Sequence, residues 1–261
     1  MSRIFHRLVI ERAWDTTPRA RAAQLRVPEH LSREFAYRAG QHIQLRAQTD
    51  SGVEEPAYSL CSSPEAGEPL TIAVKRSEGS SISGIVQSML VTGATIEVSL
   101  PNGTFGIARE PDSHRTIILV AGGSGIAPLL SIAKTVLLTE PHSRVVLIDA
   151  NTSAEEIIFA AELTELSKAW QGRLVVEHVL ESGHVDESVR SGRVHQGRVT
   201  IDVLSSILAP SLLRDPSTQV LLCGPSAMID AVSAALEVLG VAPEHIHFES
   251  FSSTAPSSPI E

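Results

Sequence analysis

The stretch that decides the fold runs from Thr116 to Pro128 and reads TIILVAGGSGIAP. Its first five residues form a nearly continuous apolar run, which predicts a strand buried on both faces. Glycines follow at Gly122, Gly123 and Gly125, and Pro128 stands near the first turn of a predicted helix, where its missing N–H does least harm. Such a turn lets the backbone approach a pyrophosphate, whose charge is stabilised by free N–H groups at the helix start. The spacing is not GxGxxG, so a strand-to-helix turn that binds nothing is the alternative.

The residues after this stretch repeat the alternation of buried strands and helices. Strands are predicted at 116–120, 144–148, 174–176 and 219–222, and helices at 127–139, 155–170 and 227–239. Strands that alternate with helices predict a doubly wound, mostly parallel α/β sheet. We expect this domain to cover residues 114–251, and the Ser- and Pro-rich segment 252–261 to be a flexible tail.

Residues 1–108 show a different sequence pattern, in which short extended segments are separated by turns. Strands are predicted at 45–47, 70–74 and 94–98, turns at 50–52, 65–69 and 101–103, and one helix at 83–90. Several short strands with regular turns predict a small antiparallel barrel as a first domain. We place the domain boundary in the polar segment 107–114.

Composition excludes several classes of protein. The chain has 261 residues, 43% of them hydrophobic, and a net charge of -9 at pH 7, so we expect no nucleic-acid partner and no attraction to anionic lipid. No apolar run is long enough for a membrane span and the N-terminus lacks a signal peptide's apolar core, so we expect a cytoplasmic protein. Two cysteines, Cys61 and Cys223, cannot build a four-thiolate zinc or iron–sulfur site. The ten histidines show no metal-ligand spacing.

A second strand-to-helix turn has the same design as the first. Residues 222–229 read LCGPSAMI and place Cys223, Gly224 and Pro225 directly after a predicted buried strand. Two such turns at the carboxyl ends of parallel strands face one crevice, where ligands bind in open α/β sheets. The alternative for Cys223 is a buried apolar filler, the commoner role of a lone cysteine.

Two segments of the first domain carry groups suited to a flat ring and to a phosphate. Tyr58 followed by Ser59 could stack on a ring and hydrogen-bond its edge, although a packed tyrosine at a strand end explains the same residues. Gly79–Ser83 combines N–H groups and hydroxyls at a helix start. This suits a phosphate, and it also suits an ordinary N-cap.

These four segments stand in the order found in the ferredoxin–NADP reductase-like flavoproteins, which the chain resembles over residues 3–251. The branch it most resembles comprises the reductase components of bacterial oxygenases. Residues 37–42 are similar to the turn that enters that family's barrel, with Ala39 in place of a proline, and residues 101–105 to its closing element. The resemblance implies a six-stranded antiparallel β-barrel that holds FAD, followed by an α/β domain that binds NADH or NADPH.

The resemblance also implies roles for individual residues. Tyr58 would pack on the flavin, with Ser59 near the flavin N5. Cys223 would lie against the nicotinamide, and Glu249 beside the flavin, so the implied catalytic set is Ser59, Cys223 and Glu249. The further residues implied in cofactor binding are Leu60, Arg76, Gly79, Ser80, Ser81, Ile82, Ser83, Gly122, Gly123, Ser124, Gly125, Pro128, Asn151, Thr152, Gly224, Pro225, Met228 and Phe251.

Three departures from the family pattern bear on function. Pro56 stands where the family has an arginine for the FAD diphosphate, and the loss of a bidentate cation there is a large change. Arg76 is its candidate replacement. Thr152 follows Asn151 where many relatives have an arginine for a 2′-phosphate. The downstream residues that could replace that arginine are Arg190, Arg193 and Arg198. The chain also lacks the four cysteines of the ferredoxin domain into which many relatives continue.

The sequence therefore predicts an NAD(P)H-dependent flavoprotein reductase. It would pass electrons through FAD to a separate ferredoxin-like protein or oxygenase component. The alternative is a non-redox nucleotide-binding or regulatory protein on the same fold, with weak or lost FAD binding. Pro56, preceded by Glu54 and Glu55, is the feature that keeps this alternative open. The choice between NADH and NADPH is left open at this point.

Overall fold

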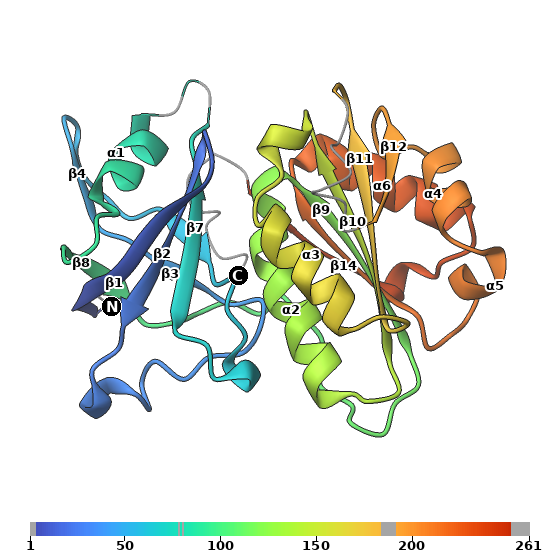
Figure 1. The fold of residues 1–261 in the computed structure, drawn as a ribbon, viewed down its shortest axis with the longest axis horizontal. Helices are drawn as coiled ribbons and strands as arrows, with labels where there is room; N and C mark the ends of the chain where they lie inside the picture. The colour runs from blue at the N-terminus through green and yellow to red at the C-terminus, as the bar shows by residue number, and fades with distance from the viewer. Residues whose placement is uncertain (1–3, 78, 80, 184–191, 252–261) are drawn as a thin grey trace, which may run out of the picture.

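The computed structural model describes residues 4–77, 79, 81–183 and 192–251. The predicted tail 252–261, Ser80 and Arg190 lie outside these residues, and the side chain of Ser81 is likewise not described. Figure 1 shows the N-terminal strands on the left and a parallel sheet with its helices on the right, with α2 (Ile126–Thr139) at the boundary.

The N-terminal half is a curled antiparallel sheet whose strands close on one another. Its longest sheet has the order β7-β2-β1-β8, while β3 pairs with β6 and β4 with β5. The bounds are β1 (Phe5–Thr17), β2 (Ala20–Arg26), β3 (His42–Gln44), β4 (Ala47–Thr49), β5 (Gly52–Glu54), β6 (Ala57–Ser59), β7 (Leu70–Lys75) and β8 (Thr95–Ser99). Bridges between Leu60 and Ile72 and between Leu45 and Val98 join the two sheets. Thus β1, β2, β7, β6, β3 and β8 form a ring, and the predicted antiparallel barrel is confirmed.

The barrel core consists of aliphatic side chains that alternate along the strands. In β1, Leu8 and Ile10 point inward while their neighbours are more exposed, the period of two expected of a half-buried strand. Helix α1 (Ser81–Met89) closes one end of the barrel, with Val86 and Leu90 fully buried in the core. This helix begins two residues before the predicted start at residue 83.

The C-terminal half is a parallel sheet of six strands in the order β12-β11-β10-β9-β13-β14, which confirms the predicted doubly wound fold. The strands are β9 (Thr116–Gly122), β10 (Arg144–Asn151), β11 (Leu174–Leu180), β12 (Arg193–Gln196), β13 (Gln219–Gly224) and β14 (Ile246–Ser250). The other helices are α3 (Ala160–Ala169), α4 (Ile201–Ile207), α5 (Pro210–Leu213) and α6 (Ser226–Val238). Short 3-10 turns are η1 (Glu29–Leu31), η2 (Pro64–Ala66), η3 (Gly123–Gly125), η4 (Ala154–Glu156) and η6 (Pro243–His245).

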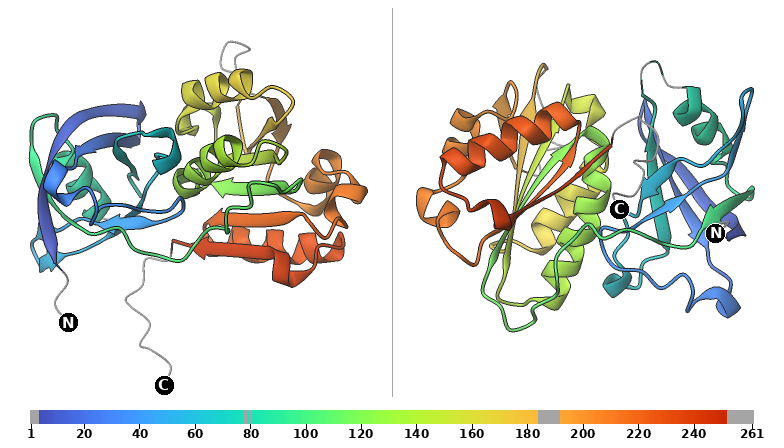
Figure 2. Two further views of the ribbon diagram at one scale, coloured as in Figure 1. Left: turned by 90° about the horizontal axis from the view of Figure 1, so that it is seen from below. Right: turned by 180° about the vertical axis from the view of Figure 1, so that it is seen from behind.

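Helices cover both faces of this sheet, as the left view of Figure 2 shows. Leu119 and its odd-numbered neighbours in β9 pack with α2 and α3, whereas Val120 and its even-numbered neighbours pack with α4 and α6. Both sets are fully buried, which explains why β9 reads as one apolar run. The strand order reverses between β9 and β13, so the carboxyl ends of these two strands form the crevice expected of this fold.

Three predictions about the second half were wrong in detail. The helix predicted at 155–170 starts only at Ala160, because Phe159 has a left-handed backbone (φ 64°) and breaks the helical path. The strand predicted at 174–176 continues to Leu180, so His178 lies buried on β11. The elements β12, α4 and α5 were not predicted, since with 4, 7 and 4 residues they are too short to show a clear period.

The barrel and the sheet are joined through α2. Small barrel side chains, Ala20, Ala22 and Ala73, share one buried cluster with residues of α2. Two polar contacts accompany the apolar ones. Ser131 Oγ donates to the Ser62 carbonyl at 2.6 Å, and the Lys134 ammonium lies 3.0 Å from Glu68 Oε2. The side chains at this junction therefore set the position of α2 against the barrel.

A buried ion pair fixes the connection between the two halves. Arg115 enters β9 with 5% of its side chain exposed and contacts Glu140, which is 1% exposed, at 2.7 Å. Glu140 Oε1 also accepts the backbone N–H of Glu110, so the pair holds the connecting segment against the end of α2.

We expect Arg115→Met to lower the free energy of unfolding by about 3–5 kcal/mol, because it leaves the Glu140 carboxylate buried without its cation. Urea denaturation measures the change. Arg109→Met is the matched control, because Arg109 pairs with Glu65 while 57% exposed, and should cost less than about 1 kcal/mol. Equal losses in the two variants would contradict the role assigned to Arg115.

Candidate functional site

The two glycine-containing turns lie directly against each other at the carboxyl ends of β9 and β13. A Cβ added to Gly125 would overlap the backbone carbonyl of Cys223, and one added to Gly122 would lie 2.7 Å from Met228 Sδ. A Cβ at Gly224, whose φ is +156°, would lie 3.0 Å from the Gly122 Cα. Glycine is therefore required for this close approach, and the structure brings together the two turns that the sequence singled out.

The first of these turns leads into a helix whose first N–H groups have no side-chain cap. Helix α2 has Gly125 as its N-cap residue, with no side-chain hydrogen bond there. Gly123 and Ser124 are partly exposed, whereas Gly122, Gly125 and Pro128 are buried beneath them. The partly exposed backbone of Gly123 and Ser124, directly before the start of α2, suits the phosphates of a nucleotide.

The second turn and the last strand place a thiol beside a carboxyl group. Cys223 lies opposite Glu249 in the β13–β14 pairing. Burial raises the pKa of the Cys223 thiol, and the neighbouring Glu249 adds to this, so the thiol is neutral. Glu249 Oε2 is buried with no hydrogen-bond partner among the described residues, and burial raises the pKa of Glu249 to about 7. The Phe251 N–H donates to the Gly224 carbonyl at 3.4 Å, so the backbone of Phe251 lies at the same edge of the sheet.

In the barrel, Tyr58 and Ser59 end the short strand β6. Ser59 is 4% exposed, and Tyr58 is partly buried against the barrel core, with the pKa of its phenol raised by that burial. Leu60 fits the implied set less well. Its side chain is fully buried in the core and its N–H donates to the Gln41 carbonyl, so only the rest of its backbone can reach a cofactor.

The start of α1 is closed by an internal hydrogen bond. Ser83 Oγ accepts the backbone N–H of Ser77 at 3.0 Å, and Ile82 packs against the barrel core. Gly79 has φ +73° and open space around the position of a Cβ. This geometry is compatible with both interpretations of the segment. The Ser83 hydrogen bond suits an ordinary helix start, and the open space at Gly79 leaves room for a phosphate.

Lys75 is a site residue that the sequence analysis missed. Its ammonium lies 2.8 Å from Glu156 Oε2 and 3.5 Å from the position of a Cβ on Gly123, so it touches the first turn of the crevice. Arg76, which the resemblance implied instead, points the other way and bonds Gln87 Oε1 at 3.2 Å. Neighbouring residues of a strand face opposite sides, and this alternation was the signal that could have separated the two cations.

Asn151 and Thr152 lie at the end of β10. Asn151 is buried and donates from Nδ2 to Asp149 Oδ2 at 2.9 Å, whereas Thr152 is exposed. Two of the three arginines considered as replacements are paired with carboxylates, Arg193 with Glu177 and Arg198 with Glu181, each at 2.8 Å, whereas Arg190 lies outside the described residues. Neither of these two arginines is therefore an unpaired cation available to a 2′-phosphate.

The segment 54–56, which reads Glu-Glu-Pro, contains no cationic side chain. The Pro56 carbonyl accepts the N–H of Leu45, and the adjacent Glu55 is paired with Arg46 at 3.0 Å. Within the described residues, no three His, Cys, Asp or Glu side chains are grouped to hold a metal ion. No helix in this part of the chain is long and apolar enough to cross a membrane.

Comparison with known proteins matches both halves of the chain. The family described as "Oxidoreductase FAD-binding domain" matches residues 9–107, and the "Oxidoreductase NAD-binding domain" matches residues 119–234. A relative from Escherichia coli (strain K12), which is one of the subunits of 1,2-phenylacetyl-CoA epoxidase, is 32% identical over 95% of this chain and 68% of its own length.

A second relative is the 3-ketosteroid-9-alpha-monooxygenase, ferredoxin reductase component, of Rhodococcus rhodochrous. It is 35% identical over 97% of this chain and 67% of its own length. The chain thus spans about two thirds of these relatives. A solved ferredoxin NADP+ reductase from Neisseria gonorrhoeae shares the fold with a TM-score of 0.75, at 24% identity, over 94% of this chain and 98% of that one.

We expect Gly125→Ala to abolish binding of a nicotinamide nucleotide and to lower stability by about 1–3 kcal/mol, because the added methyl group overlaps the Cys223 carbonyl. Isothermal titration calorimetry and urea denaturation measure the two effects. Gly84→Ala on α1 is the control, since a Cβ there meets nothing within 4 Å, and it should retain both properties. Wild-type coenzyme affinity in the Gly125 variant would contradict the close contact between the turns.

Glu249 gives a prediction about pH. Its pKa is raised from 4.5 to about 7 in the folded protein, so the folded state keeps a proton that the unfolded chain has lost. The resulting stabilisation is present at low pH and is lost as the pH rises towards 7. Glu249→Gln should therefore gain stability over wild type between about pH 4.5 and 7, with a constant difference above, in urea denaturation at a series of pH values. Glu244→Gln, at an exposed position of the same half of the chain, is the control for the change of side chain. A difference independent of pH for Glu249→Gln would refute the assignment.

Proposed function

We propose that this chain, which belongs to the oxidoreductases that join an FAD-binding domain to an NAD-binding domain, is a reductase that carries electrons from a nicotinamide nucleotide through FAD to a separate acceptor. The observation that supports it most is the contact of the two glycine turns, Gly122–Gly125 and Cys223–Pro225, at the point where the strand order reverses. Strand β7 of the barrel reaches this crevice through Lys75. A cofactor on the barrel and a nucleotide on the sheet would thus face each other.

The residues present fit both groups. The uncapped start of α2 and the open backbone at Gly123 suit the coenzyme pyrophosphate, and Tyr58 with Ser59 suits the flavin ring. When bound, FAD accepts a hydride from the reduced nicotinamide and releases its electrons one at a time.

The chain's own contribution is to orient the two rings and to keep charge and water away from them. The neutral Cys223 thiol forms an uncharged wall, and Glu249 beside it is protonated up to about pH 7. Ser59 supplies a hydroxyl that can donate a hydrogen bond to a ring nitrogen. Such alignment supplies a large part of the acceleration in a transfer between two bound groups.

For the acceptor we propose an oxygenase component or a ferredoxin-like protein. The two relatives are a component of an epoxidase and the ferredoxin reductase component of a monooxygenase. The two cysteines of this chain, Cys61 and Cys223, are both buried free thiols. They cannot supply the four thiolates of an iron–sulfur cluster, so electrons leaving FAD go to a cluster or oxidant that this sequence does not contain.

For the coenzyme we propose NADH. The end of β10 offers exposed Thr152 in place of an arginine, and the carboxylates of Glu155 and Glu156 follow on η4. Lys75, the cation that faces this region, is already paired with Glu156. A 2′-phosphate would add about two negative charges beside these groups, whereas a ribose hydroxyl adds none.

Anaerobic titration of the FAD-loaded protein with NADH and with NADPH tests this proposal. We expect NADH to bleach the flavin absorbance and NADPH to require at least about tenfold more coenzyme. Thr152→Arg should reduce this preference, because it adds a cation where the 2′-phosphate would lie. Gln171→Arg places the same charge at the exposed end of α3, away from the crevice, and should leave the preference unchanged. A colourless protein that takes up no FAD would refute the reductase and favour a non-redox nucleotide-binding protein.

A further inference from the structure

Helix α2 meets the barrel with three buried polar side chains, which are Ser131, Lys134 and Thr135. Ser131 Oγ donates to the Ser62 carbonyl at 2.6 Å, and the hydroxyls of Thr135 and Ser63 lie 2.8 Å apart. The Lys134 ammonium contacts Glu68, a few residues further along the same barrel segment. Hydrogen bonds form only at particular distances and angles, so these contacts fix α2 against the segment 62–68 more closely than apolar contacts with alanines do.

The segment that α2 contacts directly follows the residues proposed for the flavin. Ser62 stands three residues after Ser59, and its hydroxyl accepts the Thr71 N–H at 3.0 Å and lies 2.7 Å from the Tyr37 hydroxyl. The Cys61 N–H donates to the Thr71 carbonyl at 2.9 Å. The segment is therefore fixed within the barrel, so the contacts that place it against α2 also place Ser59 relative to α2.

The first residues of α2 follow directly on the turn proposed for the coenzyme. Gly125 of this turn is the N-cap residue, and Lys134 lies nine residues further along the chain, about 14 Å along the helix at 1.5 Å per residue. Nearly all residues of α2 are buried, so the helix is packed on all sides and its two ends keep a fixed distance. Helix α2 is thus a rigid connection between the coenzyme turn and the barrel segment.

Lys134 is the one charged residue in the sequence of α2, and it joins three elements. Its side chain is 8% exposed, and its ammonium contacts Glu68 of the barrel at 3.0 Å and Glu162 of α3. Glu68 Oε2, the oxygen that contacts the ammonium, also accepts the Ser63 N–H at 2.8 Å. Burial lowers the pKa of Lys134, but the two carboxylates raise it above its ordinary value, so the ammonium stays charged.

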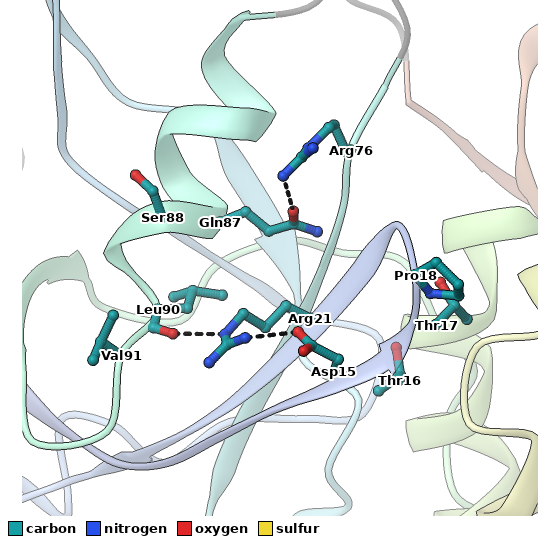
Figure 3. A pocket seen from close by; sticks show the side chains of 10 residues that line it. All are labelled: Asp15, Thr16, Thr17, Pro18, Arg21, Arg76, Gln87, Ser88, Leu90 and Val91. Carbon is teal, nitrogen blue, oxygen red and sulfur yellow. Dashed lines mark hydrogen bonds and ion pairs between the residues drawn. The ribbon is translucent and has the colours of Figure 1, made fainter.

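The cations at the end of β7 do not contact α2. Figure 3 shows Arg76 directed at Gln87 of α1, in a cavity of about 590 Å³ between the β1–β2 hairpin and α1. Lys75 does form an ion pair across the boundary between the two halves, but its partner Glu156 lies on η4 rather than on α2. Within the part of the chain that the structure describes, Lys134 therefore provides the ion pair that joins α2 itself to the barrel.

We propose that Lys134, through its ion pair with Glu68, is a positioning residue for hydride transfer between the coenzyme and the flavin. The inference rests on the proposed function. In that step a C–H bond of the reduced nicotinamide breaks and its hydride forms a bond to a flavin nitrogen, so the nicotinamide is oxidised and FAD is reduced by two electrons. A misplacement of about 1 Å between two bound reactants can cost about 100-fold in rate. The ion pair acts on this distance, because it holds the coenzyme turn in place relative to Ser59.

Two glutamine substitutions at the same ammonium test this role. Glu68→Gln removes the carboxylate on the barrel, and Glu162→Gln, the matched control, removes the carboxylate on α3. Stopped-flow mixing of the FAD-loaded protein with saturating NADH, in the absence of oxygen, measures the rate of flavin reduction. We expect Glu68→Gln to slow this reduction at least about tenfold, while the dissociation constants of NADH and FAD stay within about twofold of wild type. Glu162→Gln should keep the rate within about twofold of wild type.

Substitutions of Lys134 supply a second set of measurements. Lys134→Met removes the ammonium and should slow flavin reduction at least as much as Glu68→Gln, whereas Lys134→Arg keeps the charge and should recover most of the rate. The double variant with Glu68→Gln should be no slower than Lys134→Met alone, because both substitutions break one contact. The charge-transfer absorbance that arises when a nicotinamide ring stacks on a flavin should weaken in each of the slow variants.

Three results would overturn the role of Lys134. They are a wild-type rate in Glu68→Gln, equal slowing in Glu68→Gln and Glu162→Gln, and slowing that is matched by a loss of NADH affinity. If urea denaturation shows that Lys134→Met is unfolded, the two glutamine variants decide. In all these cases the wild-type protein is still reduced, so the proposed reductase stands. A wild-type protein that takes up no FAD, or whose FAD neither coenzyme reduces, overturns the proposed function as well.

Discussion

The site depends on one backbone contact, in which Gly125 lies on the carbonyl of Cys223 and Gly224 lies on Gly122. This contact needs two neighbouring parallel strands whose helices leave on opposite faces, because only then do both turns stand at the same edge. The order of the sheet, with β9 between β10 and β13, provides that arrangement. The absence of side chains lets the two turns touch, and β14 brings Glu249 beside Cys223 of the second turn.

Charge is distributed unevenly along the chain, and it is low in the crevice. Residues 1–108 hold 11 Lys and Arg against 11 Asp and Glu, so the net charge of -9 belongs to the remainder of the chain. Within the crevice, however, Cys223 is neutral and Glu249 keeps a proton up to about pH 7. The low charge at Cys223 and Glu249, beside the proposed nicotinamide site, thus results from desolvation rather than from composition. Lys75, the last residue of β7, faces the crevice and is paired with Glu156, whereas the next residue, Arg76, bonds Gln87 on the other side.

Local signals explain the successes of the sequence analysis. The apolar run of β9, its glycine turn and the equivalent turn after β13 are short-range patterns, and the structure places all three as predicted. The start of α3 was misplaced because Phe159 adopts a left-handed backbone while its side chain is buried, a tertiary effect that helical periodicity cannot reveal. Arg193 and Arg198 looked available because their partners are not nearby in sequence: Glu177 lies on β11 and Glu181 directly follows it.

The sequence by itself determined the two-part architecture and the position of both glycine turns, since each is encoded in neighbouring residues. Only the tertiary structure decided which cation faces the crevice, how Glu249 comes to hold a proton, and that a cavity opens behind Arg76. These properties depend on burial and on partners far away along the chain. Lys75 reaches Glu156 across the boundary between the two halves, and no local pattern encodes a contact of that kind.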